Sequence, residues 1–266
     1  MGDGHEVVLV RDVGTVRVLT LNRPQSRNAL SSALNVALYE ALIDADANDD
    51  VHAVVLTGSP PAFCAGVDLK EAASRGQDYF AQFGKTDCVA AAGQLRKPLI
   101  AAVNGAAFTG GLELALGCDF MIASEQAVFA DTHLRVGVLP GGGMTARLPH
   151  LVGSGWARRL SMSGEVIDAA TALRIGLVTE VTPPGRLLPR SLEIAGQVAD
   201  VPPSSVRALK SVYTTAAGQS LPEALALEAV IAHANPPDLG AIEGRRQTVM
   251  LRNRRQLADN PAPPGE

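Results

Sequence analysis

Two glycine-containing segments hold the residues with the clearest chemical potential. They span residues 62–70 and 104–115, and each follows a run of apolar, strand-like residues. In the second, Gly110 and Gly111 stand where a helix is expected to begin. The first turn of a helix has backbone N–H groups without internal acceptors, and the helix dipole is positive there. Because glycine lets a ligand approach the backbone closely, the pattern favours an oxyanion hole, a pair of N–H groups aimed at an oxygen that gains negative charge.

Glu113 follows those glycines by about one helical turn, inside an otherwise apolar segment. A carboxylate beside a bound ligand suits general base or general acid chemistry. A second interpretation is equally open at this point: the glycines only permit a tight turn, and Glu113 is a buried structural carboxylate.

The elements around these segments predict an α/β fold. Apolar, β-branched runs predict strands, a period of 3.6 predicts helices, and their alternation implies parallel strands with crossovers. The predicted strands are 7–10, 16–21, 53–57, 99–103, 120–123 and 177–181. The predicted helices are one capped by Ser31 or Ser32, then 145–152, 157–162, 168–175, 187–199, 206–217, 221–233 and 241–256. Residues 59–97 show a loop and helical material with no clear strand.

Composition and charge exclude several classes of protein. The net charge of −4 and the lack of a binding motif argue against a nucleic-acid role for the arginines near the C-terminus. Cys64, Cys88 and Cys118 have no metal-ligand spacing, and their odd number without a signal peptide predicts reduced thiols in the cytoplasm. The most apolar long segment, residues 99–116, is broken by Asn104, glycines and Glu113, so no membrane span is expected.

Several motifs in order resemble the crotonase (enoyl-CoA hydratase/isomerase) family over about residues 6–256. They are Asn22-Arg23-Pro24 with Asn28-Ala29-Leu30, Phe63-Cys64-Ala65-Gly66-Val67-Asp68-Leu69, Lys97–Gly105 with Gly110–Ala115, Val138–Gly143 and Leu173–Val178. The resemblance implies a ββα spiral core followed by a helical trimerisation region. We place the division between an α/β core, residues 1–195, and a C-terminal helical region, residues 196–266, which packs on the core and on neighbouring subunits.

The resemblance also implies roles for single residues. The oxygen of an acyl-CoA thioester would lie between the backbone N–H groups of Val67 and Gly110, and Glu113 would be the first of two catalytic carboxylates. The residues implied to bind the CoA moiety are Ala65, Val67, Asp68, Leu69, Lys70 and Gly110.

The sequence departs from the family where the second catalytic glutamate is expected, because His133 stands there. Histidine exchanges protons near neutral pH, and a neutral imidazole has one acceptor and one donor nitrogen with which to bind water. The other interpretation is that His133 only lines the site. Asp131, two residues earlier, would point elsewhere from a strand, but it could orient His133 if the segment bends.

The leading hypothesis is an enoyl-CoA hydratase, a lyase that adds water to trans-2-enoyl-CoA in fatty-acid metabolism, with Glu113 and His133 binding the water. The alternatives are a 3-enoyl/2-enoyl-CoA isomerase that uses Glu113 alone and a non-catalytic acyl-CoA-binding protein. The resemblance implies acyl-CoA as substrate and no cofactor, while residue spacing, charge and the broken apolar segment predict no metal and no nucleic-acid or membrane partner. It also implies a homotrimer or a dimer of trimers.

Overall fold

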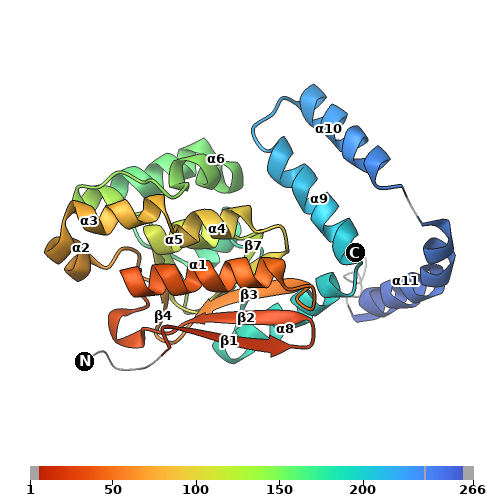
Figure 1. The fold of residues 1–266 in the computed structure, drawn as a ribbon, viewed down its shortest axis with the longest axis horizontal. Coiled ribbons are helices and arrows are strands. Elements are labelled where there is room, and N and C mark those ends of the chain that lie inside the picture. The colour runs from red at the N-terminus through yellow and green to blue at the C-terminus, as the bar shows by residue number, and fades with distance from the viewer. Residues whose placement is uncertain (1–5, 237, 260–266) are drawn as a thin grey trace, which may run out of the picture. The chain divides into compact units, whose positions relative to one another are not determined.

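Two β-sheets with helices packed around them form the core of the chain in the computed structural model, which describes residues 6–236 and 238–259 (Figure 1). The larger sheet has six strands in the order β1-β2-β3-β5-β7-β10. Their bounds are β1 Val8–Val13, β2 Val16–Leu21, β3 Ala53–Gly58, β5 Leu99–Val103, β7 Phe120–Ser124 and β10 Glu180–Thr182. Only the β1–β2 pair in this sheet is antiparallel. The predicted α/β class is therefore confirmed.

Alternating side chains of the large sheet enter two separate apolar cores. Leu19 and Leu56 belong to one core, which also contains Leu38 of helix α1 (Ser32–Ala47). Val18 and Val55 belong to the other, together with Ala195 of helix α8 (Leu187–Ala199). Because successive residues of a strand point to opposite faces, burial on both sides explains the nearly continuous apolar runs seen in the sequence.

A second, smaller sheet was not predicted. It has the order β4-β6-β8-β9, with β4 Ala62–Cys64, β6 Ala106–Phe108, β8 Val128–Ala130 and β9 Ile167–Asp168. These strands have two or three residues each, too few to show the alternation by which strands are recognised. Each of β4, β6 and β8 directly follows a strand of the large sheet, which produces a repeated strand–strand–helix unit along the chain.

The first long helix begins at the predicted capping residue. Ser31 is the N-cap of α1, and its hydroxyl accepts a hydrogen bond from the Leu34 N–H at 3.2 Å. The remaining helices are α2 Leu69–Arg75, α3 Gln77–Ala81, α4 Cys88–Gln94, α5 Gly110–Leu116, α6 Met144–Ser163, α7 Ala169–Arg174, α9 Pro203–Ala216, α10 Leu221–Ala234 and α11 Leu239–Asp259. The two helices expected between residues 145 and 162 are one element, α6, interrupted by non-helical backbone at Gly153. The strand expected at 177–181 forms only at residues 180–182.

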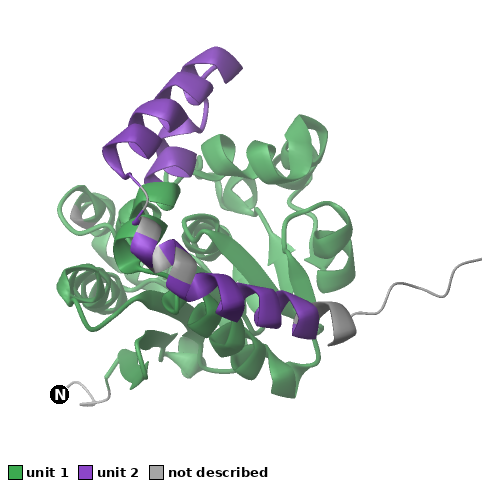
Figure 2. Cartoon of the chain, turned by 90° about the vertical axis from the view of Figure 1, so that its right-hand side faces the viewer, with its two compact units in different colours: residues 1–210 green, residues 211–266 purple. Residues whose placement is uncertain are grey.

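The chain separates into two compact units, Met1–Lys210 and Ser211–Glu266 (Figure 2). The second unit contains α10 and α11. A capping box between Ser220 and Glu223 starts α10, and none of its side chains is buried. The sequence-based division after residue 195 stays a prediction about where the α/β core ends. Within the described part of the chain, no helix is both long enough and apolar enough to span a membrane.

Candidate active site

The ends of three short parallel strands bring the predicted site residues together. β4, β6 and β8 pair in parallel, so the residues after each strand meet at one edge of the small sheet. Those residues include Val67 after β4, Gly110 after β6 and His133 after β8. A cavity of about 240 Å³ lies at this edge. Its lining comprises Leu30, Val67, Phe80, Phe83, Asp87, Val89, Gly110, Glu113, His133, Val138, Leu139, Gly141 and Gly142.

Glu113 lies in the first turn of α5 and is only 4 % exposed. Its Oε1 accepts hydrogen bonds from the backbone N–H groups of Gly142, at 2.8 Å, and Met144, at 3.1 Å. These donors belong to the loop before α6 and to its first residue. They satisfy one carboxylate oxygen, so the other, Oε2, is left on the side of His133, whose Nε2 is 3.7 Å away.

His133 is held by Asp131 on its other side. The Asp131 Oδ1 lies 2.6 Å from His133 Nδ1, and it also accepts the His133 backbone N–H at 3.3 Å. The chain leaves β8 at Ala130 and enters a 3-10 helix at His133, so the segment bends. Asp131 was expected to point away from His133 if the segment were extended, and to orient His133 if the segment were bent. The segment is bent, and Asp131 contacts His133. The bend joins Asp131, His133 and Glu113 in one row.

The charge state of Asp131 determines what His133 can do. Burial alone would disfavour the ionised carboxyl, but the hydrogen bonds from His133 and Ser161 outweigh this effect and lower the pKa of Asp131 below its ordinary value. An ionised carboxylate only accepts hydrogen bonds, so Nδ1 of His133 carries the hydrogen of this contact. In the neutral imidazole, Nε2 is therefore an acceptor that faces Glu113.

The two predicted oxyanion donors, Val67 and Gly110, line the same cavity. Leu30 pairs with Val67 as a parallel bridge: the Leu30 N–H donates to Gly66 O at 2.7 Å, and the Asp68 N–H donates to Leu30 O at 3.4 Å. In such a bridge the N–H of the middle residue, Val67, points away from Leu30. Gly110 is the first residue of α5, where an N–H has no acceptor within the helix. A Cβ built on Gly110 would lie 3.8 Å from Val67 N, so the two backbones are close neighbours.

Close backbone contact between the two segments requires glycine at position 66. Gly66 has φ +91°, and a Cβ there would meet the Thr109 Oγ1 at 1.9 Å and the Phe108 carbonyl oxygen at 2.8 Å. Thr109 itself has φ 49°, a conformation that is rare and strained for a β-branched residue. The strain sits directly before Gly110, where it sets the direction of the first N–H groups of α5.

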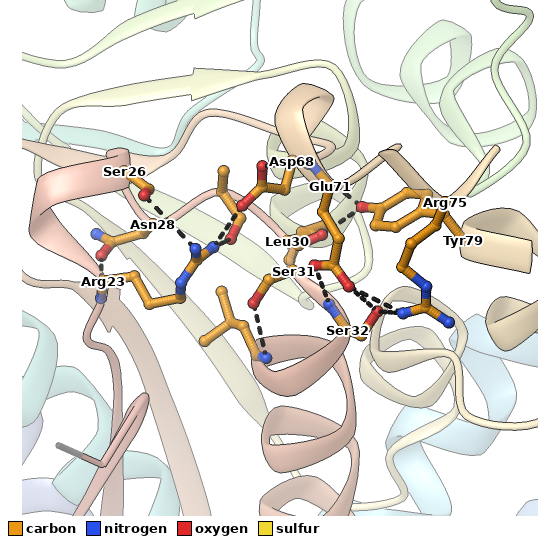
Figure 3. Close-up of polar contacts among 12 residues, drawn as sticks. Arg23, Ser26, Asn28, Leu30, Ser31, Ser32, Asp68, Glu71, Arg75 and Tyr79 are labelled. Atoms are coloured by element: carbon orange, nitrogen blue, oxygen red, sulfur yellow. Dashed lines mark hydrogen bonds and ion pairs between the residues drawn. The ribbon is translucent and has the colours of Figure 1, made fainter. Parts of the chain in front are cut away.

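A group of ionic contacts fixes the loop that carries Val67 (Figure 3). Arg23 Nη1 forms an ion pair with Asp68 Oδ2 at 3.0 Å and donates to Ala29 O at 2.6 Å. The buried Tyr79 hydroxyl donates to Leu30 O and accepts the Asp68 N–H at 3.2 Å. The Asn-Arg-Pro motif thus lies beside the Val67 loop rather than in the cavity, and its arginine positions that loop.

Helix α2, which follows that loop, is tied to α1 by a second ionic group (Figure 3). The Glu71 carboxylate accepts the Ser32 N–H at 2.9 Å and the Ser32 hydroxyl, and it pairs with Arg75 at 2.9 Å. Burial opposes ionisation of Glu71, but these donors together lower its pKa from the ordinary value. Helix α2 is thereby anchored at the start of α1.

Four of the residues expected to bind CoA lie outside the cavity lining. Ala65 and Asp68 are half-buried, and Asp68 is also the N-cap of α2, where it accepts the Glu71 N–H at 3.2 Å. Leu69 is 57 % exposed, and Lys70 next to it on α2 is also exposed. Asp68, Leu69 and Lys70 directly follow Val67 in the chain, and Val67 does line the cavity.

Asn28 links the motif loop to the small sheet, and its replacement should destabilise the fold. The fully buried amide donates to Ser59 O at 2.9 Å and Ala62 O at 2.7 Å, and accepts the Arg23 N–H at 2.8 Å. Asn28→Ala removes the donor to Ser59 O and the acceptor of the Arg23 N–H, while Ala62 O keeps the hydrogen bond from Asn104 Nδ2 at 3.2 Å, so we expect a loss of roughly 2–4 kcal/mol in the free energy of unfolding. Urea denaturation measures it, with the exposed Asn253→Ala as control. Equal midpoints for both variants would contradict this assignment.

Comparison with known proteins gives the family. The family model described as enoyl-CoA hydratase/isomerase matches residues 11–246. A probable enoyl-CoA hydratase of Rhizobium meliloti is 43 % identical over 229 residues, which cover 84 % of this chain and 87 % of that protein. The crotonyl-CoA hydratase of Syntrophomonas wolfei is 35 % identical, with 85 % and 88 % covered.

Solved structures agree with this result. An enoyl-CoA hydratase from Mycobacterium paratuberculosis superposes with a TM-score of 0.71 at 46 % identity, over 86 % of this chain and 96 % of that one. An enoyl-CoA hydratase from Bacillus anthracis gives a TM-score of 0.85 at 33 % identity, over 91 % and 96 %. The matches extend over most of the chain and include both glycine-containing segments, so the chain belongs to the enoyl-CoA hydratase/isomerase family.

Proposed function

We propose that this protein is an enoyl-CoA hydratase that adds water to trans-2-enoyl-CoA to give 3-hydroxyacyl-CoA. The observation that carries the proposal is the arrangement of one cavity: Glu113 Oε2 and His133 Nε2 face each other 3.7 Å apart, and Val67 and Gly110 line the same space. That distance is too long for a direct hydrogen bond and suits a bridging water.

The reaction follows from these positions. The thioester oxygen accepts the N–H groups of Val67 and Gly110, which stabilise the negative charge that develops on it as an enolate. Glu113 takes a proton from the bridging water while the oxygen of that water bonds to C3 of the acyl chain. Glu113 then returns a proton to C2. His133 accepts the other hydrogen of the water and fixes the direction of attack.

The remaining parts of the proposal concern the rest of the substrate and the assembly. Ala65, Asp68, Leu69 and Lys70 would contact the CoA moiety beside the cavity. Addition of water transfers no electrons to an external acceptor, so the reaction requires no redox cofactor.

We place the enzyme in the cytoplasm. We assign it a trimer or a dimer of trimers, because described apolar side chains of α10 and α11, such as Val230 and Leu251, are exposed in the single chain.

The test is direct hydration by the purified full-length protein. A short and a long trans-2-enoyl-CoA are added separately, and loss of the conjugated enoyl-thioester absorbance is followed. We expect the absorbance to fall, with mass spectrometry showing the gain of one water. If 3-enoyl-CoA is converted while 2-enoyl-CoA is not hydrated, the protein is an isomerase. Tight binding without turnover of either substrate would identify a non-catalytic binding protein.

A further inference from the structure

We propose that Asp131 is a positioning residue for hydration: it holds His133 with its hydrogen on Nδ1, so that Nε2 receives a hydrogen of the nucleophilic water. The inference rests on the proposed hydratase function for its kinetic consequences. Its structural half, the tautomer of His133, does not depend on any reaction.

Asp131 makes two contacts with His133, and the side chain of Ser161 also favours its ionised form. Asp131 is 1 % exposed and His133 5 % exposed, so water competes little for their hydrogen bond. Asp131 Oδ1 lies 2.6 Å from the ring Nδ1 of His133 and accepts a hydrogen bond from the backbone N–H of His133 at 3.3 Å. Two contacts from one residue to one oxygen fix both the position and the rotation of the imidazole ring.

The gap between His133 and Glu113 then has a defined chemical character. With the hydrogen on Nδ1, Nε2 is an acceptor, and the Glu113 Oε2 opposite it is also an acceptor. Two acceptors 3.7 Å apart repel each other unless a donor lies between them. A water molecule has two hydrogens and can reach both at about 2.8 Å, so this pair selects water in one orientation. The opposite tautomer would place a donor at Nε2 and remove one of the two acceptors.

Other charges around the imidazole leave this arrangement intact. Besides Asp131 and Glu113, Asp87 lines the same cavity, and its Oδ1 accepts the N–H groups of Val89 and Ala90 at the start of α4. On the helix side, Arg147 Nη1 donates to Gly142 O at 3.1 Å. Arg135, two residues after His133, donates to Ser163 O.

The expected kinetic effect is a fall in kcat. In Asp131→Ala the oxygen that accepts the Nδ1 hydrogen of His133 is removed, so kcat should fall roughly 10–100-fold with little change in KM, because orientation of the water is lost and the substrate contacts remain. Asp131→Asn keeps an oxygen that can accept this hydrogen, so its kcat should lie between those of Asp131→Ala and the wild type.

The experiment compares the wild type, Asp131→Asn and Asp131→Ala, with the exposed Asp50→Asn as a charge control. The ring nitrogens are observed by NMR in ¹⁵N-histidine-labelled protein, and a His133→Ala sample assigns the signals among the five histidines. We expect the Nδ1–H form for His133 in the wild type and the appearance of the Nε2–H form in Asp131→Ala. Circular dichroism and thermal melting establish that each variant is folded.

The outcomes separate this inference from the proposed function. An Nε2–H tautomer in the wild type overturns it, even if no variant folds. An unchanged kcat in folded Asp131→Ala also overturns it, while hydration by the wild type still supports the proposed function. If the wild type hydrates neither substrate, the proposed function fails, and the NMR result alone decides whether Asp131 sets the tautomer.

Discussion

Replacement of Glu113 by Gln should reduce kcat for hydration by roughly 10²–10⁴-fold, the range in which general acid–base groups contribute. The glutamine oxygen can still accept the N–H groups of Gly142 and Met144, so the fold and the side-chain position should be retained. The amide group that replaces Oε2 cannot take a proton from water. The measurement is the initial rate of loss of enoyl-thioester absorbance, with calorimetric titration of a saturated acyl-CoA to show that binding persists.

A matched control is available in Glu125→Gln, because Glu125 is exposed in the turn after β7. This variant should retain the wild-type rate. If Glu113→Gln also retains a rate within a few-fold of the wild type, Glu113 is not the group that moves the proton, and another acid in the cavity, such as Asp87, must be considered.

The second large effect is expected for Gly110→Ala. A methyl group there would lie 3.3 Å from Leu30 Cδ1, a contact that the flexible leucine can relieve, and 3.8 Å from Val67 N. It would therefore crowd the space between the two N–H groups that we assign to the thioester oxygen. Loss of one oxyanion donor costs roughly 10²–10³-fold in kcat, and we expect an effect of that size. The rate of hydration at saturating substrate measures it.

Gly155→Ala in α6 is the control for the glycine replacement, because Gly155 is exposed and a Cβ there meets nothing within 4 Å. Its activity should equal that of the wild type. A Gly110→Ala variant that is folded and fully active would show that the thioester oxygen is bound elsewhere in the cavity. A variant that loses substrate affinity with kcat unchanged would place the methyl group against the ground-state substrate instead of the developing charge.

In the proposed reaction, the row of Asp131, His133 and Glu113 takes the place of the two glutamates that the family resemblance implies. A glutamate would offer the water a carboxylate oxygen directly. Here a neutral imidazole offers Nε2 to the water. The negative charge is on Asp131, which contacts Nδ1 on the opposite side of the ring. The water still meets two acceptors.

The sequence by itself determined where the strongly apolar elements lie, and it identified Glu113 as a candidate for catalysis. Strands β2 and β5 and helix α8 lie where their apolar patterns predict, because burial on one or both faces forces that pattern into the sequence. The pattern of two glycines before a carboxylate in an apolar segment marked Glu113 as a candidate, and the resemblance to the family favoured a catalytic role over a structural one. His133 was found by its position in the motif order.

Only the tertiary structure decided which groups meet. The short strands β4, β6 and β8 have three residues each, so no local pattern marks them, yet their parallel pairing places Val67, Gly110 and His133 at one edge. Asp131 reaches His133 because the backbone bends after Ala130, which depends on packing around the small sheet. The N–H groups of Gly142 and Met144 reach Glu113 from about thirty residues away. Such contacts arise from the path of the chain in three dimensions, which local residue patterns do not encode.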